Sequence, residues 1–223
     1  MPVNIAIDGP SGAGKSTVSR AVAKKLGFLY VDTGAIYRTV GLWVARNGKN
    51  PENEAEVKPL LSGAKINMTY NEKGQRLWLN GEDVSEAIRT PEASRNASKV
   101  SALPCVRTFL LDMQRRIAAE NDCIMDGRDI GTVVLPKADL KLFLTASAED
   151  RARRRTLELE ERGTPQKYES VLADIEERDE RDKNRPIAPL KQAEDAILFD
   201  TTGNTLEQSV QAVFEICRKA IEK

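Results

Sequence analysis

The sequence predicts an α/β protein in which helices wrap a parallel five-stranded sheet and a small antiparallel subdomain is inserted along the chain. Two patterns support this prediction. Short apolar runs alternate with segments of helical periodicity, which is typical of parallel strands that are buried on both faces. Between residues 65 and 79 the period changes to alternation of apolar and polar residues, which indicates an antiparallel hairpin. The runs that we expect to form the sheet are 3–8, 28–32, 123–126, 140–144 and 196–200.

The inserted subdomain is expected to contain the hairpin, with its turn at 71–74, and a helical segment at 91–102. A second helical segment, 104–119, has an apolar stripe and is expected to lead the chain back to the sheet. The sequence contains no repeat and no low-complexity segment. We therefore expect one domain over residues 1–223, with a core at about 1–62 and 104–223 and the insertion at about 63–103.

The last third of the chain predicts two further helical regions. A highly charged segment extends over 149–185, and Gly163, Thr164 and Pro165 predict an interruption within it. Such a tip is compatible with a segment that closes over a ligand and excludes water. In the final helix, Thr205 and Gln208 have the spacing of a capping box.

Composition excludes several classes of chemistry. The chain has no histidine, which removes histidine nucleophile pairs, histidine-ligated zinc sites and histidine acid–base catalysis. The three cysteines are widely spaced and suggest neither a disulfide framework nor a zinc site. Lys and Arg together number 34, as do Asp and Glu, so no basic field predicts a nucleic-acid or membrane partner. The apolar runs are too short to span a bilayer and no signal peptide is evident, so we expect a cytoplasmic protein.

The most specific motif follows the first apolar run. Residues 9–16 fit G-x-x-x-x-G-K-[ST], the loop whose backbone N–H groups surround phosphates. A strand pattern precedes it and a helix pattern follows, as this motif requires, so a mere glycine-rich turn is disfavoured. Lys15 is expected to reach the β- and γ-phosphates of ATP, and the Ser16 hydroxyl to ligate Mg²⁺. The residues expected to bind ATP here are Gly9, Pro10, Ser11, Gly12, Ala13, Gly14, Lys15, Ser16 and Thr17.

Two further groups of charged residues are expected at the same edge of the sheet. Residues 126–129, Asp-Gly-Arg-Asp, directly follow the third strand, where a carboxylate could orient a phosphate through Arg128 or lie in the outer shell of Mg²⁺. Arginines suited to phosphate also recur in the charged segment. They are Arg151, Arg153, Arg154 and Arg155, of which Arg154 is expected at ATP, and Arg178, Arg181 and Arg185, which share one helical face with Asp182. A solvated face of ion pairs is the alternative interpretation for the segment.

The order of these motifs resembles bacterial-type cytidylate kinases over nearly all of the chain. The resemblance is carried by the phosphate loop, Asp32 to Arg38 (DTGAIYR), the hairpin, residues 126–132 (DGRDIGT) and the arginines from 178 to 185. It implies the fold of P-loop nucleoside monophosphate kinases, with a monophosphate-binding insertion and a helical lid at about 151–170. It also implies transfer of the γ-phosphate of ATP, with Mg²⁺, to CMP or dCMP.

The resemblance further implies roles for single residues. Thr33, Ser98, Arg107 and Asp129 match nucleoside contacts, with Ser98 and Arg107 reading cytosine. Arg38, Arg128 and Arg185 match phosphate contacts, Arg178 and Asp182 match the sugar-side pair, and Asp126 belongs to the CMP site. The catalytic set is then Lys15, Arg128, Asp129, Arg178, Asp182 and Arg185. We expect ATP and CMP or dCMP as the partners of a monomer that binds neither nucleic acid nor membrane.

Three alternatives stay open at the level of sequence. Another P-loop kinase, for uridylate, shikimate or dephospho-coenzyme A, would share the loop. A non-catalytic regulatory GTP-binding module usually carries N-K-x-D, which is absent here. A nucleic-acid-dependent ATPase is disfavoured by the balanced charge.

Overall fold

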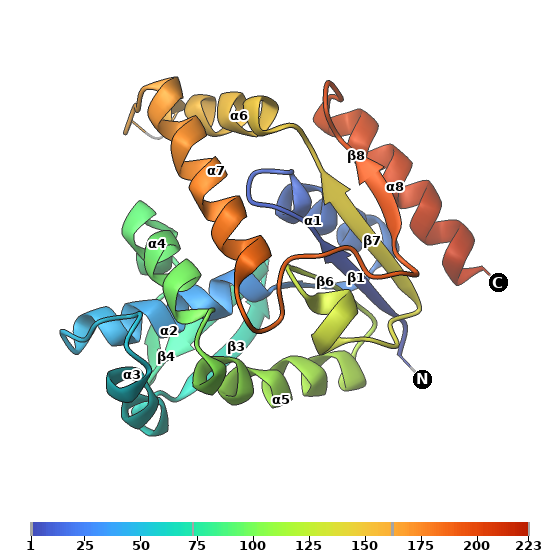
Figure 1. The fold of residues 1–223 in the computed structure, drawn as a ribbon. Coiled ribbons are helices and arrows are strands. Elements are labelled where there is room, and N and C mark those ends of the chain that lie inside the picture. Colours follow the sequence, from blue (N-terminus) through green and yellow to red (C-terminus); the bar gives the residue numbers. More distant parts are fainter. Residues whose placement is uncertain (1, 73, 162, 223) are drawn as a thin grey trace. The chain divides into compact units, whose positions relative to one another are not determined.

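The computed structural model describes residues 2–72, 74–161 and 163–222. The chain divides into two compact units, which are described in turn: Met1–Leu29 with Asn121–Lys223, and Tyr30–Glu120. Figure 1 shows the course of the chain through them. The predicted turn at 71–74 includes residue 73 and the predicted lid at about 151–170 includes residue 162, and these two residues lie outside the described part.

A five-stranded sheet forms the framework, with strand order β2-β6-β1-β7-β8. The pairings of β1 with β6, of β1 with β7 and of β7 with β8 are parallel. The strands are β1 (Asn4–Asp8), β2 (Leu29–Asp32), β6 (Cys123–Gly127), β7 (Leu140–Thr145) and β8 (Ile197–Asp200). All five predicted strands are confirmed, with each boundary within one residue of the prediction. Since parallel strands end at the same edge, the loops after β1, β6, β7 and β8 gather there, as predicted.

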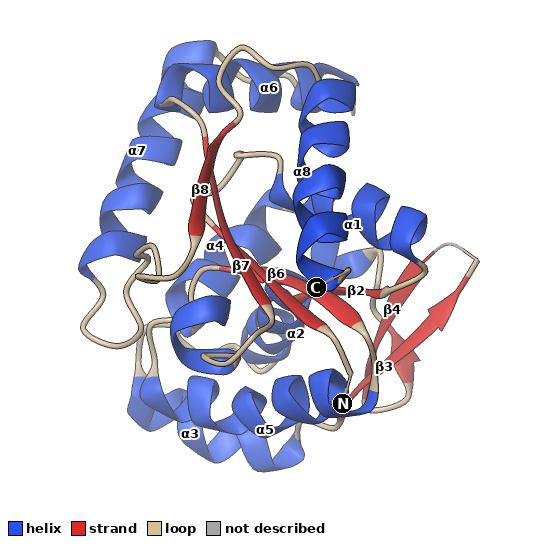
Figure 2. Cartoon of the chain, turned by 90° about the vertical axis from the view of Figure 1, so that its right-hand side faces the viewer, coloured by secondary structure: helices blue, strands red, loops and turns tan. Residues whose placement is uncertain are grey.

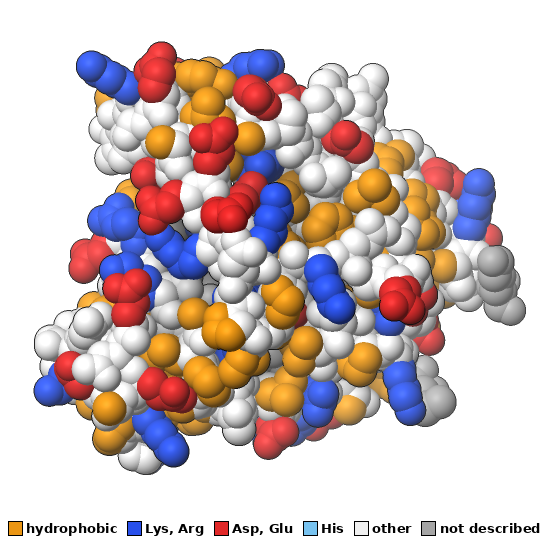
Figure 3. Space-filling model, in the orientation of Figure 1, with side chains coloured by type: hydrophobic (Ala, Val, Ile, Leu, Met, Phe, Trp, Pro, Cys, Tyr) orange, Lys and Arg blue, Asp and Glu red, His pale blue; other side chains and the backbone are white. Residues whose placement is uncertain are grey.

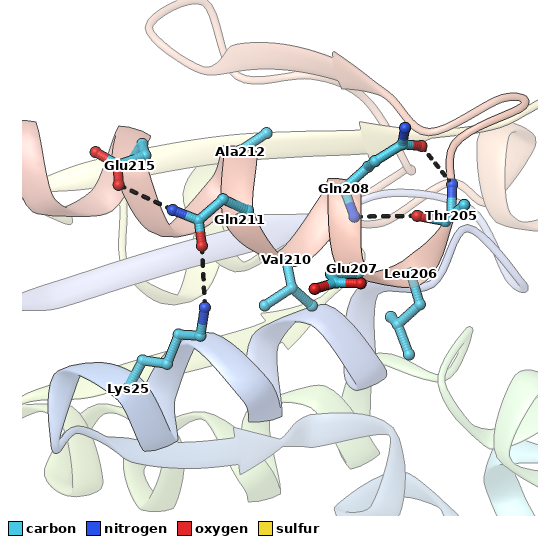
Figure 4. A pocket seen from close by; sticks show the side chains of 9 residues that line it. All are labelled: Lys25, Thr205, Leu206, Glu207, Gln208, Val210, Gln211, Ala212 and Glu215. Atoms are coloured by element: carbon cyan, nitrogen blue, oxygen red, sulfur yellow. Dashed lines mark hydrogen bonds between the residues drawn. The ribbon is translucent and has the colours of Figure 1, made fainter.

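The helices of the first unit flank this sheet. They are α1 (Lys15–Leu26), α6 (Ala148–Glu161), α7 (Tyr168–Asn184) and α8 (Leu206–Ile221), with a short π-helical turn, η3 (Ile130–Val134). Helices α1 and α8 lie side by side (Figure 2), and Lys25 of α1 donates a hydrogen bond of 3.1 Å to Gln211 of α8 beside a shallow groove (Figure 4). The predicted capping box of Thr205 and Gln208 begins α8.

Helices α6 and α7 pack against each other through a small apolar cluster made by Ala152, Leu159, Val171 and Ile175. Acidic and basic side chains are interspersed over the same two helices (Figure 3). Many of these charges form pairs within one helix, such as Arg181 with Glu177. The alternative interpretation of the charged segment 149–185, a solvated face of ion pairs, therefore holds for part of it.

The second unit combines helices with a three-stranded antiparallel sheet of order β3-β4-β5. Its elements are α2 (Thr33–Arg46), α3 (Glu54–Leu60), η1 (Leu61–Gly63), β3 (Ile66–Asn71), β4 (Gly74–Leu79), β5 (Glu82–Asp83), η2 (Ala87–Arg89), α4 (Pro91–Val100) and α5 (Pro104–Glu120). The predicted hairpin and both predicted helical segments are confirmed. The short elements α3 and β5 were not predicted. Apolar residues of the helices and the hairpin, including Ile36, Val40, Leu77 and Val106, form one core.

None of the helices in the described part of the chain combines the length and the apolar character needed to cross a membrane.

Candidate active site

The phosphate loop lies between β1 and α1, and its first glycine is required by close packing. The backbone of Gly9 has φ +147°, and a Cβ atom built there would lie 1.8 Å from the carbonyl oxygen of Leu144 on β7. No other residue fits without displacing that strand. Gly14, at the end of the loop, adopts the left-handed conformation just before α1 begins. The loop is therefore held against the sheet, and the N-terminal N–H groups of α1 are left for an anion.

Lys15 is the centre of a cluster of positive charge. Its side chain is buried, and its Nζ donates a hydrogen bond of 2.7 Å to the carbonyl oxygen of Pro10. Burial and the nearby charges of Arg128 and Arg178 lower the pKa of Lys15 to about 7, whereas Asp126 and Asp8 act in the opposite direction. The two arginines disfavour the charged form of Lys15, and an anion that binds among the three groups relieves this repulsion. The cluster thus has the electrostatics of a polyphosphate site.

The Ser16 hydroxyl donates a hydrogen bond of 2.7 Å to Oδ2 of Asp126. Asp126 lies on β6 next to Ile7 of β1, so the sheet itself sets this contact. In the described part of the chain, no three acidic or cysteine side chains are grouped so as to hold a metal ion. One hydroxyl and one carboxylate suit Mg²⁺, which takes its other ligands from phosphate oxygens and water.

Two ion pairs join the end of β6 to the end of α7. Nε of Arg128 lies 2.8 Å from Oδ2 of Asp182, and Nη2 of Arg185 lies 3.2 Å from Oδ1 of Asp129. Burial alone would raise the pKa of Asp182, but the charges of Arg128 and Arg178 and the hydrogen bond from Arg128 hold it below its ordinary value. The structure thus brings the predicted charged residues of two distant segments together around the phosphate loop.

Asp8, the last residue of β1, fixes the loop that follows β6. Its two carboxylate oxygens accept hydrogen bonds from the backbone N–H groups of Ile130, at 2.8 Å, and Gly131, at 2.7 Å. Burial raises the pKa of Asp8 to about 6 in spite of these two bonds, which act in the opposite direction. These contacts fix the start of η3, directly after Asp129. Asp8 therefore holds the backbone from which the side chain of Asp129 projects.

The arginines of α6 divide into two groups. Arg154 donates to the hydroxyl of Thr201, at 3.0 Å, and to its carbonyl oxygen, at 2.6 Å, and the Thr201 hydroxyl lies 3.3 Å from the carbonyl oxygen of Ala13. Arg154 therefore lies beside the phosphate loop, and its contact with ATP stays a prediction. Arg153 and Arg155 pair with acidic residues of α6 itself.

Arg151 is an anchor of the loop. Its guanidinium donates to the carbonyl oxygen of Ser11, at 3.0 Å, and to Oδ2 of Asp179 on α7, at 2.6 Å. Both side chains of this ion pair are buried. Removing one partner would leave an uncompensated charge, so the pair locks α6 and α7 to the phosphate loop.

The second unit carries the other predicted acceptor residues on three helices. Thr33 is buried at the start of α2, Ser98 is buried on α4, and Arg107 is buried on α5. Helices α2 and α4 approach closely because Gly41 faces α4, where a Cβ atom would lie 3.0 Å from Cβ of Asn96. The guanidinium of Arg107 lies 5.7 Å from the centre of the Tyr37 ring and donates to the carbonyl oxygen of Ser101, at 2.9 Å. The helices that carry these predicted residues thus lie in the same unit, with α2 packed closely against α4.

Arg38, also on α2, forms an ion pair of 2.9 Å with Asp32. Its Nε is buried and has no hydrogen-bond partner among the described residues. The guanidinium thus retains a donor for an anion.

Sequence reasoning missed three residues that organise these groups: Asp8, Asp32, which pairs with Arg38, and Gln75, whose side-chain amide is hydrogen-bonded to the backbone of Asp32. The signal for Asp8 was available, since a carboxylate that ends a buried apolar strand needs partners there. Gln75 offered no such signal, because its position in the hairpin is also typical of an exposed polar residue.

Comparisons with known proteins show the family to which the chain belongs. The family model described as cytidylate kinase matches residues 5–219. The cytidylate kinase of Carboxydothermus hydrogenoformans is 52% identical over 214 residues, which cover 96% of each chain. That of Caldanaerobacter subterraneus subsp. tengcongensis is 51% identical over 98% of this chain and 96% of its own. A crystal structure of an uncharacterized protein from Eubacterium ventriosum has a TM-score of 0.55 at 11% identity, covering 98% of this chain and 99% of its own, which shows likeness of fold alone.

Proposed function

Because the chain belongs to the cytidylate kinase family, we propose that it transfers the γ-phosphoryl group of ATP to CMP and dCMP, with release of ADP and of CDP or dCDP. The observation that carries this proposal is the cation cluster of Lys15, Arg128 and Arg178 beside the phosphate loop. Phosphoryl transfer depends mainly on positioning and on stabilisation of negative charge, and this cluster supplies both.

Mg²⁺ would be held through Ser16, with Asp126 next to it as a direct or outer-shell partner. The 2.7 Å contact between the two side chains supports this placement. When bound, the ion supplies charge neutralisation at the β- and γ-phosphates. Asp126 then belongs to the ATP side of the reaction, in addition to the role at CMP expected from the sequence.

The transfer itself needs no general base. A phosphate oxygen of CMP, already ionised near neutral pH because its second pKa is about 6, attacks the γ-phosphorus in line. The new P–O bond forms as the bond between that phosphorus and the β–γ bridging oxygen breaks, and ADP leaves with the electron pair. Lys15, Arg128 and Arg185 stabilise the charge on the transferring group, and Arg154 binds ATP beside Thr201.

The acceptor contacts follow, residue by residue, from the motifs of the family. Arg38, Arg128 and Arg185 bind phosphate, whereas Arg178 and Asp182 bind the sugar. The nucleoside contacts are Thr33, Ser98, Arg107 and Asp129, with Ser98 and Arg107 reading cytosine. Cytosine offers an N4 amino donor together with O2 and N3 acceptors, while uracil presents an O4 acceptor in place of the donor. A pocket built for the amino group leaves a buried acceptor unpaired when UMP binds, which favours CMP.

The proposal is tested by an ADP-release assay with ATP and Mg²⁺ as donor and a panel of acceptors: CMP, dCMP, UMP, shikimate and dephospho-coenzyme A. We expect the highest kcat/KM with CMP or dCMP. Family membership disfavours the other acceptors, and a higher value with any of them would overturn the proposal.

Replacement of Lys15 by alanine should abolish the CMP-dependent release of ADP. Lys24→Ala is the matched control, because Lys24 is an exposed lysine of the same helix. Equal turnover of Lys15→Ala and the wild type would contradict the assigned mechanism.

We further propose that the enzyme acts as a cytoplasmic monomer and without nucleic acid. The equal numbers of basic and acidic residues support the last point. Addition of polynucleotide should leave the CMP-dependent rate unchanged. Sedimentation analysis in the presence of both substrates should give the mass of a single chain.

A further inference from the structure

The side-chain amide of Gln75, on β4 of the hairpin, holds the backbone of Asp32. Its Oε1 accepts a hydrogen bond of 2.8 Å from the N–H group of Asp32, and its Nε2 donates one of 3.2 Å to the carbonyl oxygen of the same residue. Asp32 ends β2, which is an edge strand of the parallel sheet. Edge strands leave backbone groups unpaired, and here one side chain pairs two of them.

Asp32 in turn holds Arg38. One carboxylate oxygen, Oδ1, accepts the N–H group of Ala35 at 2.9 Å and so caps the start of α2. The other, Oδ2, lies 2.9 Å from Nη2 of Arg38, one and a half turns into the same helix. The direction of the guanidinium is therefore set by a residue whose backbone Gln75 fixes.

We propose that Gln75 is a positioning residue for the acceptor monophosphate, and that it acts through Asp32 on the guanidinium of Arg38. The inference rests on the proposed function, in which Arg38 binds the phosphate of CMP. It adds that the hairpin contributes to phosphate binding without touching the nucleotide. An arginine that is oriented before binding loses less conformational freedom when the phosphate arrives, which raises affinity.

The alternative is that Gln75 only attaches the hairpin. The next residue of the same strand makes polar contacts of its own, since Arg76 lies 2.6 Å from Asp83 on the neighbouring strand β5 and 3.4 Å from Glu86. This neighbour provides a matched control, because Arg76→Ala removes polar contacts of the hairpin and leaves those to Asp32 intact.

The test is a steady-state comparison of Gln75→Ala, Arg76→Ala and Arg38→Met, together with the double variant Gln75→Ala/Arg38→Met. For Gln75→Ala we expect the KM for CMP to rise about ten-fold, in keeping with the loss of two hydrogen bonds that orient a charged group, with the KM for ATP and kcat unchanged. The ratio of kcat/KM for CMP and dCMP should also stay unchanged, because the defect lies at the phosphate. Arg76→Ala should behave as the wild type.

The double variant separates action through Arg38 from a general effect. If Gln75 acts through Arg38, the double variant has the same KM for CMP as Arg38→Met alone. Multiplication of the two single effects would overturn the inference, as would a wild-type KM in Gln75→Ala. Should Gln75→Ala fail to fold, Gln75→Glu replaces it in the cycle, because the carboxylate keeps its length and accepts from Asp32 but cannot donate.

The same data distinguish failure of the inference from failure of the proposed function. If Arg38→Met has a normal KM for CMP, or the wild type does not use CMP, the assignment of Arg38 is wrong. If Arg38→Met is impaired and Gln75→Ala is not, only the role of Gln75 is wrong.

Discussion

The hydroxyl of Ser16 lies 2.7 Å from Oδ2 of Asp126, so the last residue of the phosphate-loop motif is already joined to the neighbouring strand. The contact links the N-terminus of α1 to β6 at the sheet edge. A cation at Ser16 would therefore have a carboxylate beside it before any nucleotide binds. A carboxylate suits Mg²⁺, because this ion prefers oxygen ligands.

Asp126→Asn is expected to weaken the use of Mg²⁺. The amide keeps the shape of the side chain but lacks the negative charge that supports the ion, so the Mg²⁺ concentration for half-maximal rate should rise about 10- to 100-fold. The measurement is a Mg²⁺ titration at fixed ATP. Asp174→Asn, on the exposed side of α7, provides the same change of charge as a control. An unshifted titration of Asp126→Asn would show that the carboxylate has no part in holding the ion.

Nucleotide binding should take up a proton at Lys15. Burial and the charges of Arg128 and Arg178 lower the pKa of Lys15 to about 7, so at pH 8 the free protein holds this amine mainly neutral. Phosphate oxygens favour the charged form and raise the pKa, and about one proton should then be bound per nucleotide. Calorimetric titration with Mg²⁺ and ATP in buffers of different ionisation enthalpy measures this uptake. Lys15→Met should remove it and Lys24→Met should keep it; the same uptake in all three proteins would contradict the assignment.

The unfolding free energy of the protein should depend on pH through the titration of Asp8. Its folded-state pKa of about 6 lies above the ordinary 3.8, so Asp8 favours the folded state below pH 3.8, and this contribution is lost as the pH rises through 6. Relative to Asp8→Asn, the wild type should therefore lose about 2 kcal/mol of unfolding free energy between pH 4 and pH 7. Urea unfolding across this range measures the difference. Parallel pH dependences for the two proteins would show that Asp8 titrates normally.

Gly9→Ala should disrupt the fold at the phosphate loop. The added Cβ atom would lie 1.8 Å from the carbonyl oxygen of Leu144, so the strand or the loop must move, at a cost of more than about 4 kcal/mol. Gly27→Ala is the control, since Gly27 also has a positive φ, +73°, but no atom lies within 4 Å of the added Cβ. It should cost about 1 kcal/mol. Urea unfolding of both variants tests the difference, and similar losses would show that the loop adapts.

Much of the fold could be predicted because local patterns decide it. The five strands are continuous apolar runs, of which β1 and β6 are almost fully buried, whereas the edge strand β8 exposes Ile197 and Leu198. Thr205 with Gln208 marked the start of α8 by side-chain chemistry alone. The hairpin was predictable because apolar and polar residues alternate on both sides of its turn.

The parts that could not be predicted depend on contacts between distant residues. Residues 130–134 are rich in β-branched side chains, yet they form η3, because Asp8, more than a hundred positions away, accepts the N–H groups of Ile130 and Gly131. Charge patterning placed Arg185 and Asp182 on one helical face, but their partners, Asp129 and Arg128, come from the segment that directly follows β6. Spacing within one helix cannot identify a partner that the sheet supplies.

The cation cluster lowers the stability of the free protein while it prepares the site for phosphate. In the absence of nucleotide, the fold keeps Lys15 close to two arginines that disfavour its charge, and an anion that binds among them relieves that repulsion. The free protein therefore gives up part of its stability to keep the site ready. Neutralising Lys15 would produce a protein that resists unfolding better and transfers phosphate poorly, which is the general tension between a stable fold and a prepared active site.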